Sequence, residues 1–234
     1  MILNKIYKKI IYFLFKNKKF KSEDEYYKFL FTYNPSWNSI TPNEDEKIRW
    51  HFIKEQIDKH LTNKNNLKNL EIGSGRGWLT NLLNSEYGDT IGVEPVSEVV
   101  KYAKSIYPNI KFYTSGIPSI LNLFKNEKFD LIICSEVIEH ISDKSQFFSC
   151  CKLLLNPVNG VLILTTPRSE HYSAFVEAYG SDPSQPVEEW LTENELKNLI
   201  QQSDLDIVEI KFFNRLPIKD KEILINQLFV CRIK

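Results

Sequence analysis

Three glycines at every second position, Gly73, Gly75 and Gly77, directly follow an apolar run over residues 67–72. Glycine permits positive φ angles and lets backbone N–H groups approach a ligand without a Cβ atom in the way. A turn of this kind, between a strand-like run and the helix-like stretch that begins at Trp78, is therefore shaped to hold a small molecule. Glycine-rich turns also serve close packing alone, which is the alternative here.

An acidic residue stands at the distance from these glycines at which a nucleotide-binding sheet needs one. Glu94 ends a second apolar run, over residues 90–94, and follows Gly73 by 21 positions. In doubly wound sheets, a carboxylate about 20 residues after the glycines holds the hydroxyl groups of a ribose. An ordinary strand-end acid is the alternative, but the combination of turn and acid favours a ribose-containing ligand.

The pair Glu139 and His140 follows another apolar run, over residues 129–135. Histidine titrates near neutral pH and can take a proton from a hydroxyl group as its oxygen attacks an electrophile. We therefore predict that His140, with Glu139 beside it, is the catalytic pair. The alternative is that His140 only caps the following helix or bonds the backbone.

The elements that must position these residues alternate between strand and helix patterns. Apolar runs predict seven strands, at residues 67–72, 90–95, 110–116, 129–135, 161–167, 205–213 and 223–233. Between most of them apolar residues recur at helical spacing, and Thr192 with Glu195 predicts a capping box. Strands separated by helices imply a mainly parallel, three-layer α/β/α sandwich whose ligands bind outside the carboxyl ends of the strands.

Composition limits the partners and the compartment. The chain has 234 residues, enough for one domain with a short extension, and its 30 basic and 30 acidic side chains cancel. Balanced charge gives no electrostatic reason to expect nucleic acid as a partner. The four cysteines form no Cys-x-x-Cys pair or Cys/His cluster, so we expect reduced core thiols in a cytoplasmic protein and no metal site.

Residues 1–21 contain seven lysines and no acid, and their apolar residues gather on one side of a helical wheel. This pattern predicts a basic amphipathic helix whose apolar run is too short to span a bilayer. Such a helix can lie on an anionic membrane surface, pack on its own domain, or pack on a second copy in a homodimer. Residues 22–64 are expected to form a helical cap, with Thr41 and Glu44 as the capping box of a helix before the first strand.

With these pieces in order, residues 65–234 resemble the class I S-adenosylmethionine-dependent methyltransferases. Four stretches carry the resemblance, at residues 71–77, Glu94, 129–140 and 153–167. The glycines run G-x-G-x-G, whereas the NAD fingerprint needs G-x-G-x-x-G, which argues against a dehydrogenase. The resemblance implies a seven-stranded, mostly parallel, doubly wound sheet with an antiparallel last strand at residues 223–233. It also implies S-adenosyl-L-methionine as the cofactor.

The resemblance further implies which residues hold this cofactor. Glu71 would lie near the methionine ammonium group, Glu94 would hold the ribose hydroxyls, and Ser135 would lie beside the cofactor. The expected set is Glu71, Gly73, Ser74, Gly75, Gly77, Glu94, Pro95, Ser115, Gly116, Ile117, Ser135 and Glu136. Relatives often carry an acid after the third strand to bind adenine, and this chain does not, so Ser115 or the backbone near Gly116 and Ile117 would have to serve.

The methyl acceptor should be bound by segments outside the sheet, at residues 26–50 and 168–190. Aromatic residues with a few charges in these segments suit a flat or sugar-like molecule, although they also suit a plain hydrophobic lid. The candidate acceptor-binding residues are Tyr26, Trp37, Arg49, Arg168, His171, Tyr172 and Tyr179.

The predicted function is therefore O-methylation of a small molecule, with a sugar or glycan precursor as the first hypothesis. A quinone or phenol O-methyltransferase at the membrane surface is the alternative, based on the fourth-strand motif and the basic N-terminal helix. A non-catalytic methyltransferase-like binding subunit is a third hypothesis, of a different class. The sequence leaves open the acceptor and the atom that is methylated.

Overall fold

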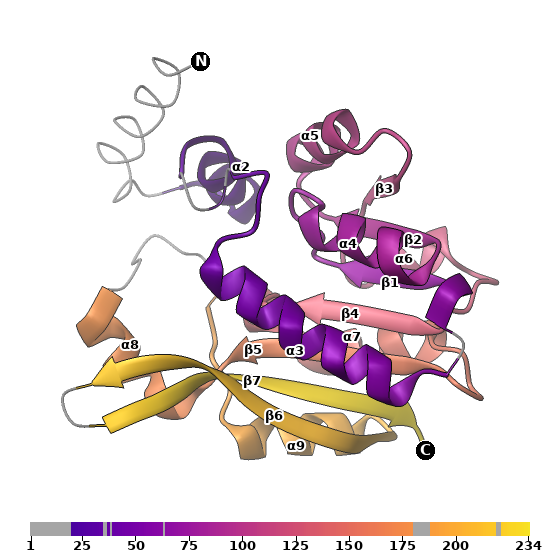
Figure 1. Cartoon of the computed structure of the whole chain (residues 1–234). Helices are drawn as coiled ribbons and strands as arrows, with labels where there is room; N and C mark the ends of the chain where they lie inside the picture. The colour runs from indigo at the N-terminus through magenta and orange to yellow at the C-terminus, as the bar shows by residue number, and fades with distance from the viewer. Residues whose placement is uncertain (1–19, 35–36, 38, 63, 180–187, 219–220) are drawn as a thin grey trace.

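The computed structural model describes residues 20–234 except 35–36, 38, 63, 180–187 and 219–220. Its centre is a seven-stranded sheet of order β3-β2-β1-β4-β5-β7-β6 (Figure 1). The strands are β1 (Asn69–Ile72), β2 (Thr90–Glu94), β3 (Lys111–Thr114), β4 (Leu131–Ser135), β5 (Val161–Pro167), β6 (Leu205–Ile218) and β7 (Lys221–Ile233). The first five are mutually parallel and β7 is antiparallel to both of its neighbours, so the expected sheet is confirmed.

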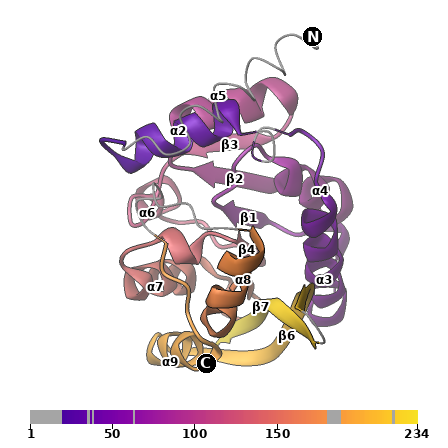
Figure 2. The ribbon, with the colours of Figure 1, turned by 90° about the vertical axis from the view of Figure 1, so that its left-hand side faces the viewer.

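Helices cover both faces of this sheet (Figure 2). They are α2 (Glu23–Tyr33), α3 (Glu44–His60), α4 (Trp78–Tyr87), α5 (Ser97–Ile106), α6 (Ile120–Leu123), α7 (Lys144–Leu154), α8 (Tyr172–Tyr179) and α9 (Glu193–Gln202). Three short 3-10 turns are η1 (Lys64–Asn66), η2 (Ile138–His140) and η3 (Ser169–His171). The three-layer α/β/α sandwich is therefore confirmed.

Strand β4 shows how the sequence directs its two faces into separate cores. All of its first four residues are fully buried. Leu131 and Ile133 belong to the cluster that α3 and α4 complete, whereas Ile132 and Cys134 belong to the cluster that α7 and α9 complete. Because successive side chains of a strand point to opposite faces, a strand between two helical layers must be apolar at every position.

The helix before the first strand begins two residues later than expected. Its N-cap is Asn43, whose Oδ1 accepts from the Glu46 N–H at 2.9 Å while the Asn43 N–H donates to Glu46 at 2.7 Å. The expected box of Thr41 and Glu44 is therefore wrong. With this start, three acidic residues lie in the first turn, where their negative charge interacts favourably with the helix dipole.

The β6–β7 hairpin is longer than its sequence pattern predicts. We expected strands at residues 205–213 and 223–233, but the pairing continues to Ile218 opposite Lys221. Asn214, with φ of +56°, and Pro217 interrupt the strand pattern without ending the strand. The extended part of the hairpin brings Asn214 and Arg215 to the cavity described below, which Asn226 of β7 also lines.

Most of the N-terminal helix expected over residues 1–21 lies outside the described residues. None of the helices that the structure describes is long and apolar enough to cross a membrane. All four cysteines are buried and unpaired. Within the described ranges, no three His, Cys, Asp or Glu side chains are grouped so that they could hold a metal ion.

Candidate active site

The glycine turn connects β1 to α4 at the carboxyl edge of the sheet. Gly73, Gly75 and Gly77 have φ angles of +77°, +48° and +84°. A Cβ atom on Gly73 would lie 2.2 Å from Cγ2 of Val137, so this position admits only glycine. The N–H groups of Gly73 and Ser74 donate to the carbonyl oxygen of Val93 at 2.8 and 3.0 Å, which fixes the turn against β2.

Two buried carboxyl groups flank the turn. Glu94 at the end of β2 accepts from the N–H groups of Gly75 and Val96, both at 3.1 Å, and burial raises its pKa to about 7. Glu71 on β1 accepts from the hydroxyl of Thr80, and burial raises its pKa to about 8. A carboxyl group in such surroundings gains from a bound cation or hydroxyl donor, because either stabilises its charged form.

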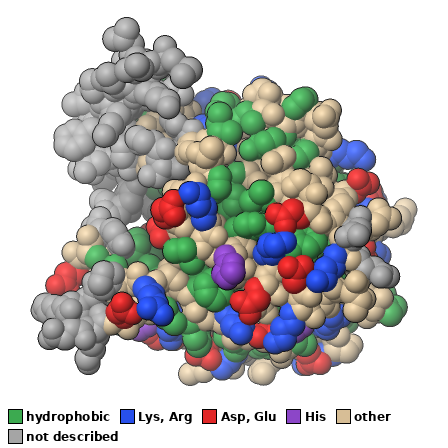
Figure 3. All heavy atoms as spheres, in the orientation of Figure 1, with side chains coloured by type: hydrophobic (Ala, Val, Ile, Leu, Met, Phe, Trp, Pro, Cys, Tyr) green, Lys and Arg blue, Asp and Glu red, His purple; other side chains and the backbone are tan. Residues whose placement is uncertain are grey.

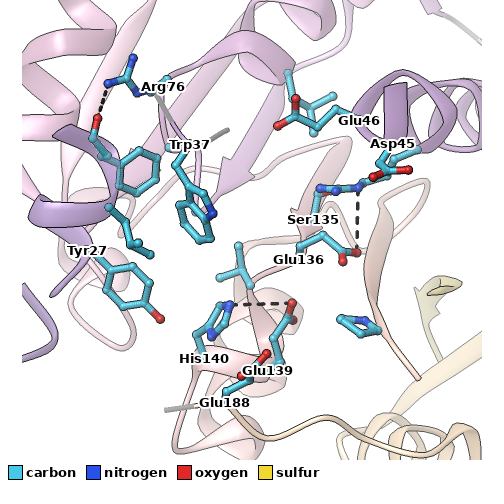
Figure 4. Close-up of a pocket in the computed structure, with 18 of the residues that line it drawn as sticks. Tyr27, Trp37, Asp45, Glu46, Arg76, Ser135, Glu136, Glu139, His140 and Glu188 are labelled. Carbon is cyan, nitrogen blue, oxygen red and sulfur yellow. Dashed lines mark hydrogen bonds and ion pairs between the residues drawn. The ribbon is translucent and has the colours of Figure 1, made fainter. Parts of the chain in front are cut away.

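The predicted catalytic pair lies on η2, just beyond β4. Glu139 is almost fully buried, and its Oε2 accepts from Thr166 Oγ1 at 2.9 Å. Its Oε1 lies 3.9 Å from Nε2 of His140 (Figure 4). Burial first, and the charge of Glu136 second, raise the pKa of Glu139 above its usual range. The imidazole of His140 therefore has a carboxyl group on one side, and the ring of Tyr27 packs edge-on at 5.8 Å on another.

These groups line one cavity of about 1130 Å³. A drug-sized ligand occupies a pocket of roughly 300–1,000 Å³, so the cavity has room for a nucleoside cofactor and a second small molecule. Its walls come from the glycine turn, from the ends of β2, β4 and β5, from α2, α3 and α8, and from the β6–β7 hairpin. The carboxyl edge of the sheet thus carries the site, as expected for parallel strands.

Aromatic side chains form two walls of this cavity. Trp37 packs against Phe31 at 5.2 Å and against Tyr27 at 6.3 Å, above the glycine turn. On the other side, Trp190 packs against Tyr172 and Phe175, both at 5.0 Å between ring centroids. The cavity is thus bordered by flat apolar surfaces that come from outside the sheet.

The structure brings most of the predicted site residues together. The predicted residues that line the cavity are Tyr26, Trp37, Arg49, Glu71, Gly73, Ser74, Gly75, Glu94, Pro95, Ser135, Glu136, Glu139, His140 and Tyr172. Their individual roles remain predictions.

Other predicted residues lie away from this lining. They are Gly77, Ser115, Gly116, Ile117, Arg168 and His171. Ser115 Oγ instead lies 3.1 Å from Ser119 Oγ. The guanidinium of Arg168 stacks on the ring of Phe212 at 4.3 Å and donates to the carbonyl of Leu224 at 3.2 Å. The side chain of Tyr179 is outside the described part of the chain.

Some lining residues were not predicted. Arg76, inside the glycine turn, donates to the carbonyl oxygen of Phe31 on α2 and stacks on the ring of Tyr102 at 4.0 Å. Its position between Gly75 and Gly77 was the sequence feature that could have identified Arg76 as a lining residue. Asn214 and Asn226 line the cavity from the β6–β7 hairpin, and nothing in their sequence surroundings distinguishes them from other strand residues.

The sheet order, the glycine turn and the acidic end of β2 together define a class I S-adenosylmethionine-dependent methyltransferase. Solved structures share this fold. A methyltransferase of this kind from Clostridium acetobutylicum superposes with a TM-score of 0.61 at 18% identity, over 80% of this chain and 91% of that one. Another from Archaeoglobus fulgidus superposes with a TM-score of 0.59 at 16% identity, over 80% and 96%.

The chain belongs to the methyltransferase domain family whose model matches residues 45–210. It is similar to the mitochondrial ubiquinone biosynthesis O-methyltransferase of Rattus norvegicus, 30% identical over 136 residues, which are 53% of this chain and 39% of the relative. It is also similar to the ubiquinone biosynthesis O-methyltransferase of Pasteurella multocida, 32% identical over 51% of this chain and 52% of the relative. The matched region thus spans only two fifths to one half of these relatives.

The chain therefore carries the methyltransferase domain that the resemblance implied, and the cofactor of this class is S-adenosylmethionine. The residues present fit the cofactor. Ser74 lines the cavity, and its Oγ is buried with no hydrogen-bond partner among the described residues, which is typical of an atom that a ligand satisfies. The raised pKa values of Glu71 and Glu94 agree with this fit.

Proposed function

We propose that this enzyme methylates a phenolic oxygen on a quinone-like aromatic acceptor. The observation that carries the proposal is the position of His140, which lies in an aromatic-walled cavity beside Glu139 and against the ring of Tyr27. The similar proteins from Rattus norvegicus and Pasteurella multocida are named ubiquinone biosynthesis O-methyltransferases, which supports the same acceptor class. They give no support to the sugar or glycan precursor that the sequence suggested first.

The cofactor would lie against the glycine turn, between Glu71 and Glu94. When bound, S-adenosylmethionine supplies an electrophilic methyl group on a sulfonium for an in-line displacement. Glu71 would pair with its ammonium group, and Glu94 would accept from the ribose hydroxyls while it keeps its bonds to the turn. Ser74 and Pro95 complete this side of the cavity.

His140 would act as the general base for the acceptor. Its imidazole takes the phenolic proton as the oxygen attacks, and Glu139 at 3.9 Å stabilises the imidazolium that results. Thr166 holds Glu139 in place through its hydroxyl. Because the pKa of Glu139 is raised, this stabilisation grows as pH rises above neutrality, and turnover should rise with it.

Charge on the outer surface is compatible with a neutral small acceptor. Figure 3 shows one face of the molecule, over α3 and the β6–β7 hairpin, on which acidic and basic side chains are interspersed. On that face no single sign of charge dominates, so it offers no broad basic surface for a phosphate backbone.

Transfer of a labelled methyl group from S-adenosylmethionine tests the proposal. The acceptor panel should contain phenol, 1,2-dihydroxybenzene and hydroquinone, with glucose and a nucleotide-linked sugar for comparison. We expect methylation of one or more phenols and none of the sugars. Methylation of sugars alone would overturn the proposal, and calorimetric titration with S-adenosylhomocysteine would establish in parallel that the protein binds its cofactor product.

A further inference from the structure

Glu136 is held in an unusual backbone conformation at the end of β4. Its φ angle is +56°, in the left-handed region that non-glycine residues seldom adopt. Its N–H donates to the carbonyl oxygen of Thr165 at 2.9 Å, and the amide of Asn226 on β7 donates to its Oε2 at 2.8 Å. The contact with β5 therefore holds the backbone of Glu136, and the contact with β7 orients its carboxylate at the cavity wall.

Arg49 reaches the same wall from α3. Its Nη1 donates to Ser135 Oγ at 3.3 Å, and its Nε lies 4.0 Å from Oε1 of Glu136. That separation is too long for a hydrogen bond. Both Nε and Oε1 are buried, and neither has a hydrogen-bond partner among the described residues. Since buried polar atoms are rarely left unpaired, the two atoms point to a group that a bound molecule supplies.

The chemistry of the two atoms defines that group. Ionised Glu136 can only accept a hydrogen bond, and the Nε–H of Arg49 can only donate one. A group that bridges them must donate on one side and accept on the other, which a hydroxyl does and an ether, a ketone or a methyl group does not. A carboxylate or phosphate there would face the charge of Glu136 at close range, which is unfavourable.

We propose that Arg49 and Glu136 form an acceptor subsite for a neutral hydroxyl group, separate from the oxygen that His140 deprotonates. Figure 4 shows His140 joined to Glu139 and Glu136 apart from this pair. The partner of Glu136 is the guanidinium of Arg49, at 4.0 Å. The subsite assigns Glu136 to the acceptor side of the cavity, whereas its position after β4 had suggested the cofactor side.

Asn214 extends this polar wall. Its Nδ2 donates to Oδ1 of Asn226 at 3.0 Å, so a chain of hydrogen bonds runs from β6 through β7 to Glu136. The Oδ1 of Asn214 is itself buried without a partner among the described residues and faces the same cavity. Like Glu136, Asn214 has a φ of +56°. The wall thus has a second acceptor atom for a hydroxyl-bearing molecule.

Calorimetry with two probes tests the subsite directly. Phenol and 1,2-dihydroxybenzene, which differ by one hydroxyl group, are titrated into protein saturated with S-adenosylhomocysteine. In Arg49→Met and Glu136→Gln, we expect affinity for 1,2-dihydroxybenzene to fall about 10- to 100-fold, as for the loss of a hydrogen bond to a charged group. Affinity for phenol should change less than about 3-fold, because phenol lacks the second hydroxyl.

Controls separate binding at the subsite from damage to the fold. Asp204→Asn removes one partner of the exposed Lys152 pair at 2.9 Å and should leave both affinities unchanged. S-adenosylhomocysteine should bind all variants equally. An equal loss for both probes, a loss of S-adenosylhomocysteine affinity in the Arg49 and Glu136 variants, or no binding of 1,2-dihydroxybenzene to the wild type would each overturn the subsite.

The proposal rests on phenol O-methylation for the identity of the acceptor, but the two can fail separately. If the wild type binds 1,2-dihydroxybenzene through Arg49 and Glu136 but methylates no phenol, the reaction fails and the subsite stands. If phenols are methylated and both probes depend equally on the two residues, the reaction stands and the subsite fails.

Discussion

The cofactor side of the cavity is built on strand ends, whereas the acceptor side is assembled from helices and the β6–β7 hairpin. On the cofactor side, the backbone of the glycine turn bonds to Val93 and to Glu94 within a few residues of paired strands. On the acceptor side, Trp37 comes from the connection between α2 and α3, Trp190 from the segment before α9, and Asn226 from β7. The first arrangement fixes positions through the main chain and the second through side chains.

This difference has a functional reason. Every methyltransferase of this class must hold the same cofactor, so a rigid main-chain cradle is suited to it. Acceptors differ between enzymes, and side chains on peripheral elements can be exchanged without disturbing the sheet. Substitutions on one side should therefore leave the binding function of the other side intact.

The largest expected effect is on turnover, at the junction of the two sides. His140→Gln should lower kcat for a phenol about 100- to 10,000-fold, since the general base is lost, while the affinity for S-adenosylhomocysteine stays within about two-fold. Stopped assays with labelled methyl groups and calorimetry measure the two quantities. His51→Gln, at an exposed position on α3, is the matched control. A kcat within about three-fold of wild type would remove His140 from the mechanism.

A methyl group on Gly73 should weaken binding of the cofactor product without changing the acceptor side of the cavity. Gly73→Ala places Cβ 2.2 Å from Val137 in a backbone with φ of +77°, so we expect affinity for S-adenosylhomocysteine to fall about 100-fold. Gly73→Ala with Val137→Ala removes the clash but keeps the strained φ, and should recover part of the loss. Unchanged affinity in the single variant, with circular dichroism like wild type, would contradict the role of this turn.

The buried carboxyl group of Glu71, which we expect to bind the cofactor, should lower the stability of the unliganded protein as pH rises. Because burial raises its pKa from 4.5 to about 8, the folded protein binds the proton more tightly than the unfolded chain. The unliganded protein should therefore lose stability as pH rises from about 4.5 to about 8. Glu71→Gln removes this loss, so its Tm at pH 8 should exceed that of wild type by roughly 10 °C, with little gain at pH 4.5.

The same variant should bind the cofactor product less well. Loss of the carboxylate that would pair with the ammonium group should weaken S-adenosylhomocysteine about 10-fold. Glu127→Gln, which removes an exposed carboxylate paired with Lys68, controls for the change of charge. An equal shift in Tm at both pH values would show that Glu71 acts through packing rather than through its ionisation.

The smallest expected effect lies on the acceptor wall. Trp190→Ala removes two aromatic contacts at 5.0 Å, and each such pair contributes about 0.5–1.5 kcal/mol. We expect the KM for a phenol to rise about 5-fold with unchanged S-adenosylhomocysteine affinity. Trp190→Phe should restore most of the loss. A fall in cofactor affinity of the same size would contradict the separation of the two sides.

The sequence revealed the cofactor side because its requirements are local. The spacing of Gly73, Gly75 and Gly77 encodes three positive φ angles in one turn, and the distance to Glu94 reflects one helix and one strand. Fully apolar runs such as β4 indicate burial on two faces. The seven-stranded sheet and its antiparallel β7 followed from these patterns together with the family resemblance.

The acceptor side was predicted less completely because it depends on contacts between distant segments. Arg49 and Glu136 are 87 positions apart in the sequence, and Asn226 is 90 positions beyond Glu136. The start of α3 was predicted wrongly, since Asn43 with Glu46 has the same capping-box spacing as the predicted Thr41 with Glu44. Asparagine is the stronger N-cap, and the structure uses it.

The position of β7 within the sheet has a consequence for how the protein folds during synthesis. It is the last described strand in the chain, yet it lies between β5 and β6, and β6 pairs with no other strand. On the ribosome, the edge of β5 and the whole of β6 therefore remain unpaired until residues 221–233 have emerged. Unpaired strand edges can associate with other chains. Because Asn226 belongs to that final segment, the nascent chain completes its sheet and its acceptor wall in the same late step.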